Sequence, residues 1–323
     1  MDRELQPLPP SPIHQVAFVV LAGQCVLAIA TRAGLSVWDP EPRASPPQSQ
    51  QQPPQQQPMR LLHRRALAAS GVPDEQAAAH FARGLAASPR GAGGGDALFC
   101  GTSWGEVLVS RFLDAGASGI IGAGVPGASL VGGHRAAITS VAADERCVVS
   151  ADDAGVLAQW EAPTASAASA RAPVAVLDKG AGAPCTSLAL QGPLIVAGYA
   201  SGHVRIFRQG GGGGGAGDAP LRPAVLEAEI GAHARCVTAL SFHPSRPTFA
   251  SVGEDCMLNV WSLPEAPVEG GGVRVRVLLD LAAPIRDRLL AGVAFARPGG
   301  RGSAVHVVAS AYDVASLFVF LGI

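Results

Sequence analysis

Three side chains of the types used by serine hydrolases occur close together in the sequence: His233, Ser251 and Asp255. Nucleophilic catalysis needs a serine hydroxyl beside a histidine base whose ring is oriented by a carboxylate. The same three residues also fit a structural role, because a buried imidazole needs hydrogen-bond partners and a carboxylate can accept from it. We expect no catalytic residues, since the structural role accounts for all three.

A second pattern of possible chemistry is the glycine-rich segment Gly122–Gly127, which matches Gly-x-Gly-x-x-Gly and is followed by Asp144. A dinucleotide site requires a strand before these glycines and a helix after them. Here Pro126 interrupts the pattern and another turn follows. The segment is therefore interpreted as a loop, and no cofactor is expected.

A candidate metal-ligand group is formed by His233 with Cys236 or Cys256. Its spacing is not specific for a metal, and none of the six cysteines belongs to a Cys-x-x-Cys pair. Thiols in apolar strands are common. We therefore expect no metal site, and we expect reduced, mostly buried cysteines in a cytoplasmic protein, with ciliary or cytoskeletal association as a possibility.

Short apolar runs bounded by Gly, Pro, Asp or Ser dominate the chain, and this pattern is typical of strands and turns. Val237–His243, Thr248–Val252 and Met257–Leu263 are three such runs in close succession. The main exception is Asp74–Ala87, whose local propensity favours a helix. The sequence therefore predicts an all-β fold.

A strand, a short Gly/Asp turn and a second strand recur six times along the sequence. The copies are Ala28–Trp38, Phe99–Ser110, Val148–Trp160, Ile195–Phe207, Phe249–Trp261 and Val307–Phe320. Without four linker-like stretches they recur every ~46 residues, near the roughly 40–45 residues of one WD-repeat propeller blade.

Composition and charge narrow the function classes. Hydrophobic residues make up 48% of the chain and the formal net charge is −1, so neither a wholly disordered chain nor a chain-wide basic surface for nucleic acid is expected. The apolar segment Val16–Ala30 is too short for a spanning helix and contains Gly23 and Gln24. It is interpreted as two buried strands joined by a turn, so no membrane insertion is expected.

Residues 1–323 are expected to form a single propeller domain interrupted by four insertions. Residues 43–58 are rich in Pro and Gln, which predicts a disordered or polyproline-like loop. Residues 88–96, 161–172 and 210–217 are rich in Gly, Ala or Ser, and are predicted to be flexible loops. The basic run Met59–Arg65 should lie on an outer strand, where it is interpreted as a solvated face, with a partner-binding patch as the alternative.

The segment Ile230–Trp261 resembles a near-complete WD repeat, and Val131–Trp160 is a looser second copy with Gly133–His134. Further segments resemble one particular subfamily of WD-repeat proteins: Phe81–Ser88, Gly101–Val109, Ala151–Trp160, Val196–Phe207, Ile230–Leu240 and Ser310–Asp313. This resemblance implies an all-β propeller with six recognisable four-stranded blades and a seventh that is absent or incomplete. It also places His80–Ala87 in an inner strand, against its helical propensity.

The resemblance implies a structural hydrogen-bond set within a blade, made by a histidine, a strand serine, a turn aspartate and a tryptophan. His233, Ser251, Asp255 and Trp261 fill these four positions. In the looser copy, His134, Ser150 and Trp160 fit, but Ala154 stands where the aspartate is expected. There Asp152 or Asp153 could take its place.

The function implied by the resemblance is a noncatalytic scaffold or adaptor that binds other proteins through loops of a rigid propeller. One alternative is a packing subunit of a large cytoskeletal or ciliary assembly. Another is an enzyme with its site at the channel mouth, for which the sequence offers no motif. The expected partners are other proteins of unknown identity.

The end of the sequence predicts an open sheet edge in the last blade. Ser316–Phe320 forms the last predicted strand, and Met1–Pro12, the candidate for a closing strand, carries four prolines. Proline removes ladder donors and is confined to sheet edges. We therefore expect the edge to be capped by a partner or by dimerisation.

Overall fold

The structure is a computed structural model of the chain. It describes residues 13–21, 24–32, 34–39, 59–66, 81–88, 95–113, 125–126, 129–162, 172–179, 182–210, 221–267, 273–296, 305–312 and 314–322. The chain divides into two compact units, the first comprising residues 1–138 and 162–171 and the second residues 139–161 and 172–323. Each unit is described by itself.

The first unit contains two four-stranded antiparallel sheets. One has the order β1-β2-β3-β4, formed by β1 (Ile13–Leu21), β2 (Gln24–Thr31), β3 (Gly34–Asp39) and β4 (Arg60–Ala66). The other has the order β5-β6-β7-β8, formed by β5 (Ala82–Ser88), β6 (Gly95–Thr102), β7 (Val107–Leu113) and β8 (Val125–Pro126). Both sheets are therefore simple meanders whose strand order follows the sequence.

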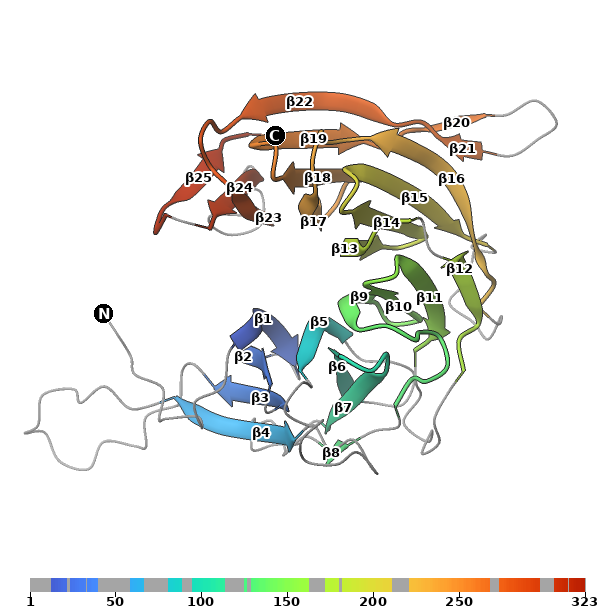
Figure 1. Cartoon of the computed structure of the whole chain (residues 1–323), viewed down its shortest axis with the longest axis vertical. Helices are drawn as coiled ribbons and strands as arrows, with labels where there is room; N and C mark the ends of the chain where they lie inside the picture. Colours follow the sequence, from blue (N-terminus) through green and yellow to red (C-terminus); the bar gives the residue numbers. More distant parts are fainter. Residues whose placement is uncertain are drawn as a thin grey trace, which may run out of the picture. The chain divides into compact units, whose positions relative to one another are not determined.

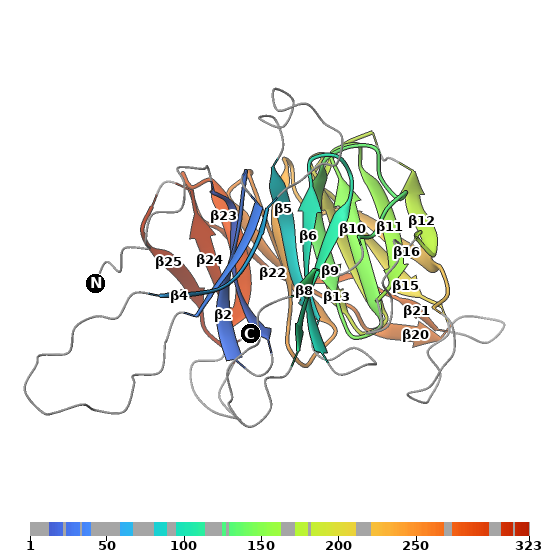
Figure 2. The same cartoon turned by 90° about the horizontal axis from the view of Figure 1, so that it is seen from below.

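The second unit begins with two further four-stranded sheets (Figure 2). One is formed by β9 (Ile138–Ala143), β10 (Cys147–Asp152), β11 (Val156–Glu161) and β12 (Ala175–Lys179). The next is formed by β13 (Cys185–Gln191), β14 (Leu194–Tyr199), β15 (His203–Gln209) and β16 (Ala224–Gly231).

A four-stranded sheet, a hairpin and a three-stranded sheet complete the second unit (Figure 1). The four-stranded sheet has β17 (Val237–Phe242), β18 (Thr248–Gly253), β19 (Met257–Ser262) and β22 (Leu278–Pro284). The hairpin is β20 (Glu265–Pro267) with β21 (Val273–Val275). The last sheet has β23 (Leu290–Ala296), β24 (His306–Ala311) and β25 (Leu317–Phe320).

These six meandering antiparallel sheets are the blades of a β-propeller fold, as the sequence predicts, and the described residues contain no helix. The strand β5 confirms the prediction from the repeat pattern and not the one from helical propensity. Residues 82–87 are extended, and β5 is the first strand of its sheet. The reason is that β5 packs its apolar side chains between sheets, and this packing outweighs local propensity.

Apolar residues on facing sheets form the cores. One cluster joins Val26 and Ala28 of β2 to Leu98 and Cys100 of β6 in the first unit. In the second unit, three successive clusters lie between neighbouring sheets from β10 to β24. The second strands β10, β14 and β18 are buried along their whole length, which explains their nearly continuous apolar sequences.

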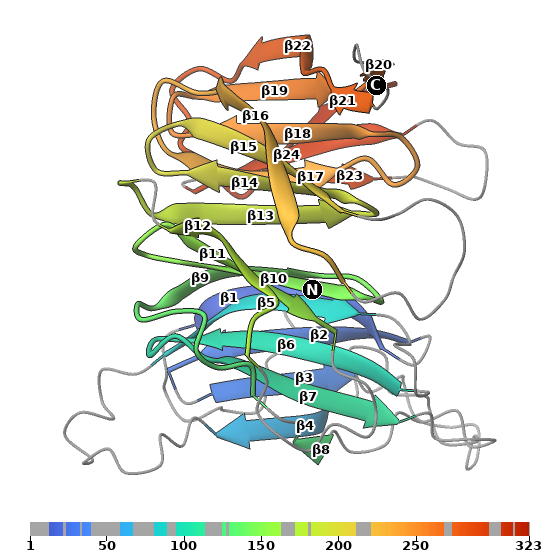
Figure 3. The same cartoon turned by 90° about the vertical axis from the view of Figure 1, so that its right-hand side faces the viewer.

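Hydroxyl side chains on the first strands of neighbouring sheets add a polar connection that we call the inner-strand clasp. The hydroxyl of Ser140 accepts from the N–H of Leu188 at 3.1 Å, and the hydroxyl of Ser187 accepts from the N–H of Leu240 at 3.0 Å. The hydroxyl of Ser241 accepts in the same way from Phe295, at 3.4 Å. Each clasp satisfies a backbone donor of β13, β17 or β23, the first strands of their sheets, which pair with a neighbouring strand on one side only (Figure 3).

Several sequence expectations can be compared with the strands. The segment Val16–Ala30 does form two strands, β1 and β2, but β1 is not buried as expected: Val16, Phe18 and Val20 are exposed. The predicted loop 88–96 contributes Ser88 to β5 and residues 95–96 to β6. Residues 43–58 and most of 161–172 and 210–217 lie outside the described residues.

The basic run Met59–Arg65 lies on β4, the outer strand of its sheet, as expected. Its face is only partly solvated. Arg64 is exposed, but the guanidinium of Arg65 donates to the carbonyl of Val109 at 2.6 Å. The ring of His63 is buried 3.3 Å from the hydroxyl of Ser110, in the neighbouring sheet. The run therefore joins two sheets.

We predict that Ser187→Ala destabilises the fold, because it leaves the buried N–H of Leu240 without its acceptor. An unsatisfied buried donor costs about 1–3 kcal/mol. Urea unfolding followed by tryptophan fluorescence measures the loss, with Ser201→Ala on the exposed surface as the control. Equal unfolding midpoints for the two variants would contradict a stabilising clasp.

Candidate functional site: a buried hydrogen-bond set

Four side chains of the fifth sheet meet where the sequence resemblance places a structural hydrogen-bond set. His233 lies between β16 and β17, Ser251 in β18, Asp255 in the turn between β18 and β19, and Trp261 in β19. Nδ1 of His233 is 2.9 Å from Oδ1 of Asp255, and its Nε2 is 2.8 Å from Oγ of Ser251. The indole N–H of Trp261 donates to the same Oγ at 2.9 Å.

One arrangement of protons satisfies all of these contacts. Because the hydroxyl of Ser251 accepts from Trp261, it can donate its own hydrogen to Nε2 of His233. Nδ1 of the neutral ring then carries the hydrogen that is donated to Asp255. This assignment follows from the network of donors and acceptors.

Asp255 also organises the backbone around the histidine. Its carboxylate accepts from the N–H groups of Ala234 at 2.8 Å and Met257 at 3.2 Å. Burial alone would raise the pKa of Asp255, but the hydrogen bonds from Ala234 and His233 outweigh it and hold the pKa below its ordinary value. The ionised carboxylate is therefore the form that the fold stabilises.

The connectivity of Asp255, His233 and Ser251 is that of a catalytic triad, but its surroundings are not those of an active site. Ser251 has no exposed surface and lies in a strand buried along its whole length. Its hydroxyl is already used by Trp261 and His233. A substrate carbonyl cannot approach it, so the arrangement can hold the sheet together but cannot perform acyl transfer.

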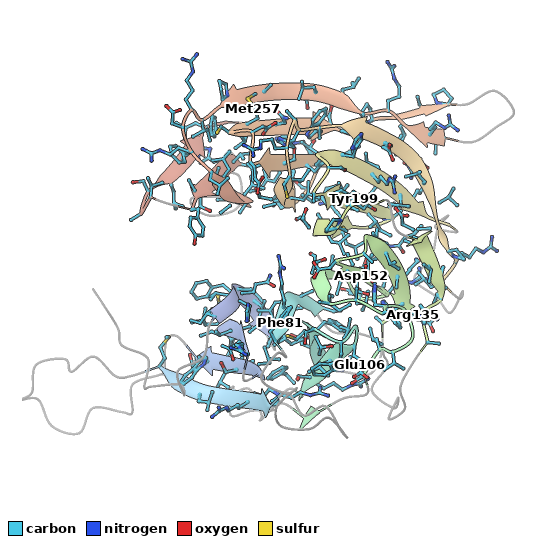
Figure 4. The ribbon with its side chains drawn as sticks, in the orientation of Figure 1. Phe81, Glu106, Arg135, Asp152, Tyr199 and Met257 are labelled. Atoms are coloured by element: carbon cyan, nitrogen blue, oxygen red, sulfur yellow. The ribbon has the colours of Figure 1, made fainter. Side chains whose placement is uncertain are left out.

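Part of the looser copy of the set lies in the second unit. The indole N–H of Trp160 donates to Oγ of Ser150 at 2.8 Å, which matches the pair in the fifth sheet. The carboxylate of Asp152, labelled in Figure 4, accepts from the N–H groups of Ala154 and Val156 in its own turn. His134, the histidine of this copy, is buried in the first unit.

A glycine in the preceding sheet allows the backbone at His233 to come close. The carbonyl of Gly202 accepts from the N–H groups of Ala232 and His233, and Gly202 has φ +83°. A Cβ there would come within 2.1 Å of the carbonyl oxygen of His233. The corresponding turn residue of the fifth sheet is Cys256, with φ 63°, a conformation that is strained for a residue with a side chain.

A charged cluster that was not predicted from the sequence lies between two sheets of the second unit. Arg205 of β15 pairs with Asp178 of β12 and with Glu229 of β16. Its guanidinium lies 5.1 Å from the ring centroid of Tyr199, which is labelled in Figure 4. The hydroxyl of Tyr199 donates to Asp178 at 2.9 Å, and burial is the main cause that raises the pKa of Tyr199. The signal in the sequence that could have indicated this cluster is the tyrosine at the end of β14, a position at which another blade has glycine.

The other candidate sites gain no support from the geometry. Among the described residues, no three His, Cys, Asp or Glu side chains are grouped so that they could hold a metal ion. The glycines of the segment 122–127 lie outside the described residues. All six cysteines are free, and burial raises the pKa of Cys100 and of Cys147 to about 12. The part of the chain that is described contains no helix able to cross a membrane.

The meandering blades and the His-Ser-Asp-Trp set together define a WD-repeat β-propeller. Comparison with known proteins then identifies the family. The WDR54 family model matches residues 4–322, so the chain belongs to the WDR54 family. This confirms the subfamily resemblance that the sequence segments carried.

Curated relatives carry the same name. The chain is 30% identical over 250 residues to WD repeat-containing protein 54 of Mus musculus, and 30% identical over 244 residues to that of Homo sapiens. These matches cover 75% and 73% of this chain. They cover 64% and 62% of the relatives, so less than two thirds of each relative is matched.

Solved structures support the fold alone. The chain is similar to the β-propeller domain of Cps50 (Swd1) from Myceliophteria thermophila, with a TM-score of 0.58 and 14% identity, over 97% of this chain and 86% of that one. It is also similar to the computationally designed Ika8 protein, with a TM-score of 0.58 and 19% identity, over 96% and 70% of the two chains.

We predict that Asp255→Asn makes the fold less sensitive to acid. The pKa of Asp255 is lowered in the folded state, so its ionised form stabilises the fold fully above about pH 4, and this contribution is lost as the pH falls further. Thermal unfolding between pH 3 and pH 7 should show a smaller acid-induced drop in midpoint for the variant. Parallel curves for both proteins would contradict the role of the carboxylate.

We also predict that Gly202→Ala destabilises the fold more than Gly132→Ala. The two glycines have nearly the same φ, +83° and +84°, but only at Gly202 does an added Cβ meet the backbone, whereas nothing lies within 4 Å of a Cβ at Gly132. The difference between their unfolding free energies therefore isolates the close approach to His233 from the strain of the left-handed conformation. Chemical denaturation of both variants measures it, and equal losses would refute the steric explanation.

Proposed function

We propose that this chain is a noncatalytic scaffold or adaptor that binds other proteins through loops at one end of the second unit. The observation that carries the proposal is that the side chains of a catalytic type are buried, while side chains of the type that binds proteins are exposed. His233 and Ser251, which are residue types that could perform catalysis, are buried inside a blade and hydrogen-bonded to each other. Apolar and cationic side chains of the kind that bind proteins are instead exposed at the loops.

We call these exposed residues the end-loop patch: Arg286, Leu289 and Tyr312. The backbone N–H of Tyr312 donates to the carbonyl of Leu289 at 2.8 Å, which brings the two residues together. Tyr312 is 81% exposed, and Arg286 and Leu289 are also exposed. Tyrosine and arginine are enriched among residues that dominate binding energy, and loops on a rigid scaffold commonly carry binding residues.

The same end of the unit is held rigidly by the hydrogen-bond set. The N–H of Ile285 donates at 2.8 Å to the carbonyl of Cys256, next to Asp255. A loop anchored in this way loses little conformational freedom when a partner binds. The six free thiols support the further proposal that the protein works in the reducing cytoplasm.

We predict that the double variant Leu289→Ser, Tyr312→Ser loses binding partners without unfolding, because both side chains are exposed. Native affinity purification with quantitative mass spectrometry should show a set of proteins that is depleted by the double variant. Val176→Ser, at an exposed position on β12, serves as the matched control and should retain them. Unchanged thermal midpoints establish that the fold is intact.

Two outcomes would contradict the proposal. Partner sets that do not differ between wild type and the double variant would exclude the end-loop patch as the binding surface. Fractionation of the wild-type protein entirely with a large insoluble assembly would favour the packing-subunit alternative over a free adaptor.

A further inference from the structure

Three cationic side chains of the first unit lie close together: His14 of β1, Arg32 directly after β2, and Arg83 of β5. We call them the cationic cluster. Ile13 pairs with Thr31 across β1 and β2, so His14 and Arg32 both adjoin this pair. The positive charges of Arg83 and Arg32 act on the ring of His14, where they add to burial in lowering its pKa. The cluster therefore concentrates groups of one sign in a chain whose formal net charge is −1.

A side-chain clasp fixes His14 beside the start of β5. Oε1 of Gln15 accepts from the N–H groups of Gly84 at 2.7 Å and Leu85 at 3.1 Å, which joins β1 to β5 next to His14. The ring centroid of His14 lies 5.0 Å from that of Phe81, which is labelled in Figure 4 and directly precedes β5. These contacts hold His14 in place before any partner binds.

The strands that carry the cluster offer it no carboxylate. Neither Asp nor Glu occurs in β1, β2 or β5. Arg32 and Arg83 make no hydrogen bond or ion pair with a described residue. The turn between β6 and β7 carries Glu106, whose charge acts on Arg65 of β4. Within the part of the chain that the structure describes, no ion pair therefore neutralises the cluster.

The position of Arg83 is one that other sheets fill with an apolar side chain. In three sheets of the second unit, the residue just before the bulge of the first strand has no exposed surface: Cys185, Val237 and Leu290. Arg83 holds this position before the bulge of β5, and it is half-buried. Partial burial of a charge costs free energy unless an opposite charge or a hydrogen bond compensates it. Packing within the fold therefore does not account for this arginine.

The position of His14 is used for internal hydrogen bonds elsewhere in the chain. The bulged residues of β13 and β17 are Thr186 and Thr238, whose hydroxyls donate to the carbonyls of Gly198 and Val252, each at 3.1 Å. His14 is the bulged residue of β1, and its ring is exposed. It makes no hydrogen bond with a described residue. Its ring nitrogens are therefore accessible to a ligand.

We propose that the cationic cluster binds an acidic segment of a partner protein through the carboxylates of that segment. This inference rests on the proposed scaffold function and names the chemistry of one partner. A guanidinium can bind a carboxylate through two parallel hydrogen bonds, so Arg32 and Arg83 suit this ligand. The bound carboxylates also supply the opposite charge that the partial burial of Arg83 requires.

Nucleic acid fits the cluster less well than an acidic peptide does. Its backbone is bound through many phosphate contacts, and its bases commonly stack on exposed aromatic rings. The cluster has three cationic groups, and the nearby ring of Phe81 is half-buried and already in contact with that of His14. An acidic peptide needs neither a long basic surface nor a free aromatic ring.

A direct test measures binding of fluorescein-labelled hexaglutamate to the full chain by fluorescence anisotropy at low salt. Wild type should show saturable binding, and Arg32→Gln and Arg83→Gln should each weaken it by about fivefold or more. The matched control Arg64→Gln removes the same charge from an exposed position on β4 of the same unit, and should bind as wild type does. Because Arg32 is exposed, its variant tests the proposal even if Arg83→Gln lowers the thermal midpoint.

His14 gives the cluster a dependence on pH that serves as a second readout. Its lowered pKa keeps the ring neutral at about pH 7.5, and a bound anion favours the protonated ring beside Arg32 and Arg83. Glutamate side chains stay mostly ionised at about pH 5.5. Hexaglutamate should therefore bind more tightly at about pH 5.5 than at about pH 7.5, and His14→Gln should remove most of this difference. An unchanged difference in the variant would contradict the proposal.

Three further outcomes would overturn the proposal. Equal weakening by Arg64→Gln and Arg32→Gln would mean that the peptide senses only overall charge. Tighter binding of oligothymidylate than of hexaglutamate at the same salt concentration would make nucleic acid the occupant. Several-fold tighter binding of hexaglutamate after Asp2→Asn with Glu4→Gln would show that carboxylates of the chain itself occupy the cluster.

The failure of this inference can be distinguished from the failure of the scaffold function. If wild type does not bind hexaglutamate, the assignment of the cationic cluster is wrong, but partners that depend on Leu289 and Tyr312 would still be captured. If the peptide binds as expected but no partner depends on the end-loop patch, the surface assigned under the scaffold function is wrong while the cationic cluster stands.

Discussion

The burial of a strand on both of its faces is the constraint on which the second unit depends. β10, β14 and β18 have no exposed face, so each of these sheets requires an apolar neighbour on either side. Stacking the sheets removes water from their backbone edges as well. The hydroxyls of Ser140 and Ser187 meet that second requirement, because they accept from backbone N–H groups of β13 and β17, strands that pair with a neighbour on one side only.

The same constraint explains why residues typical of an active site are used for structure. An imidazole and an indole N–H inside a stack must each find a partner, and Ser251 and Asp255 supply these partners without exposing themselves to solvent. Other sheets of the second unit also pair their buried polar groups. Ser150 accepts from the indole N–H of Trp160, and an arginine-carboxylate cluster surrounds Tyr199 in the sheet between.

Much of the fold could be predicted from the sequence because it repeats. The strand-turn-strand pattern predicted the sheets, and the repeat correctly predicted a strand over residues 82–87, where local propensity favours a helix. The contacts of Asp255 with His233 followed from the resemblance to WD repeats. The inner-strand clasps were missed because a serine within a strand gives no sign of its partner until the strands of two sheets are placed side by side. The exposure of Phe18 was missed for a related reason, since apolar composition does not say whether a neighbouring sheet covers a strand.

The distribution of the cysteines gives the protein a set of internal reporters. Cys100 lies in the first unit and Cys147 and Cys185 in the second, all fully buried, while Cys25 is exposed. Burial raises the pKa of each of the three buried thiols, so a folded sheet suppresses both access and reactivity. Alkylation rates at these positions would therefore time the opening of individual blades, and would separate sequential from concerted unfolding without adding any label to the chain.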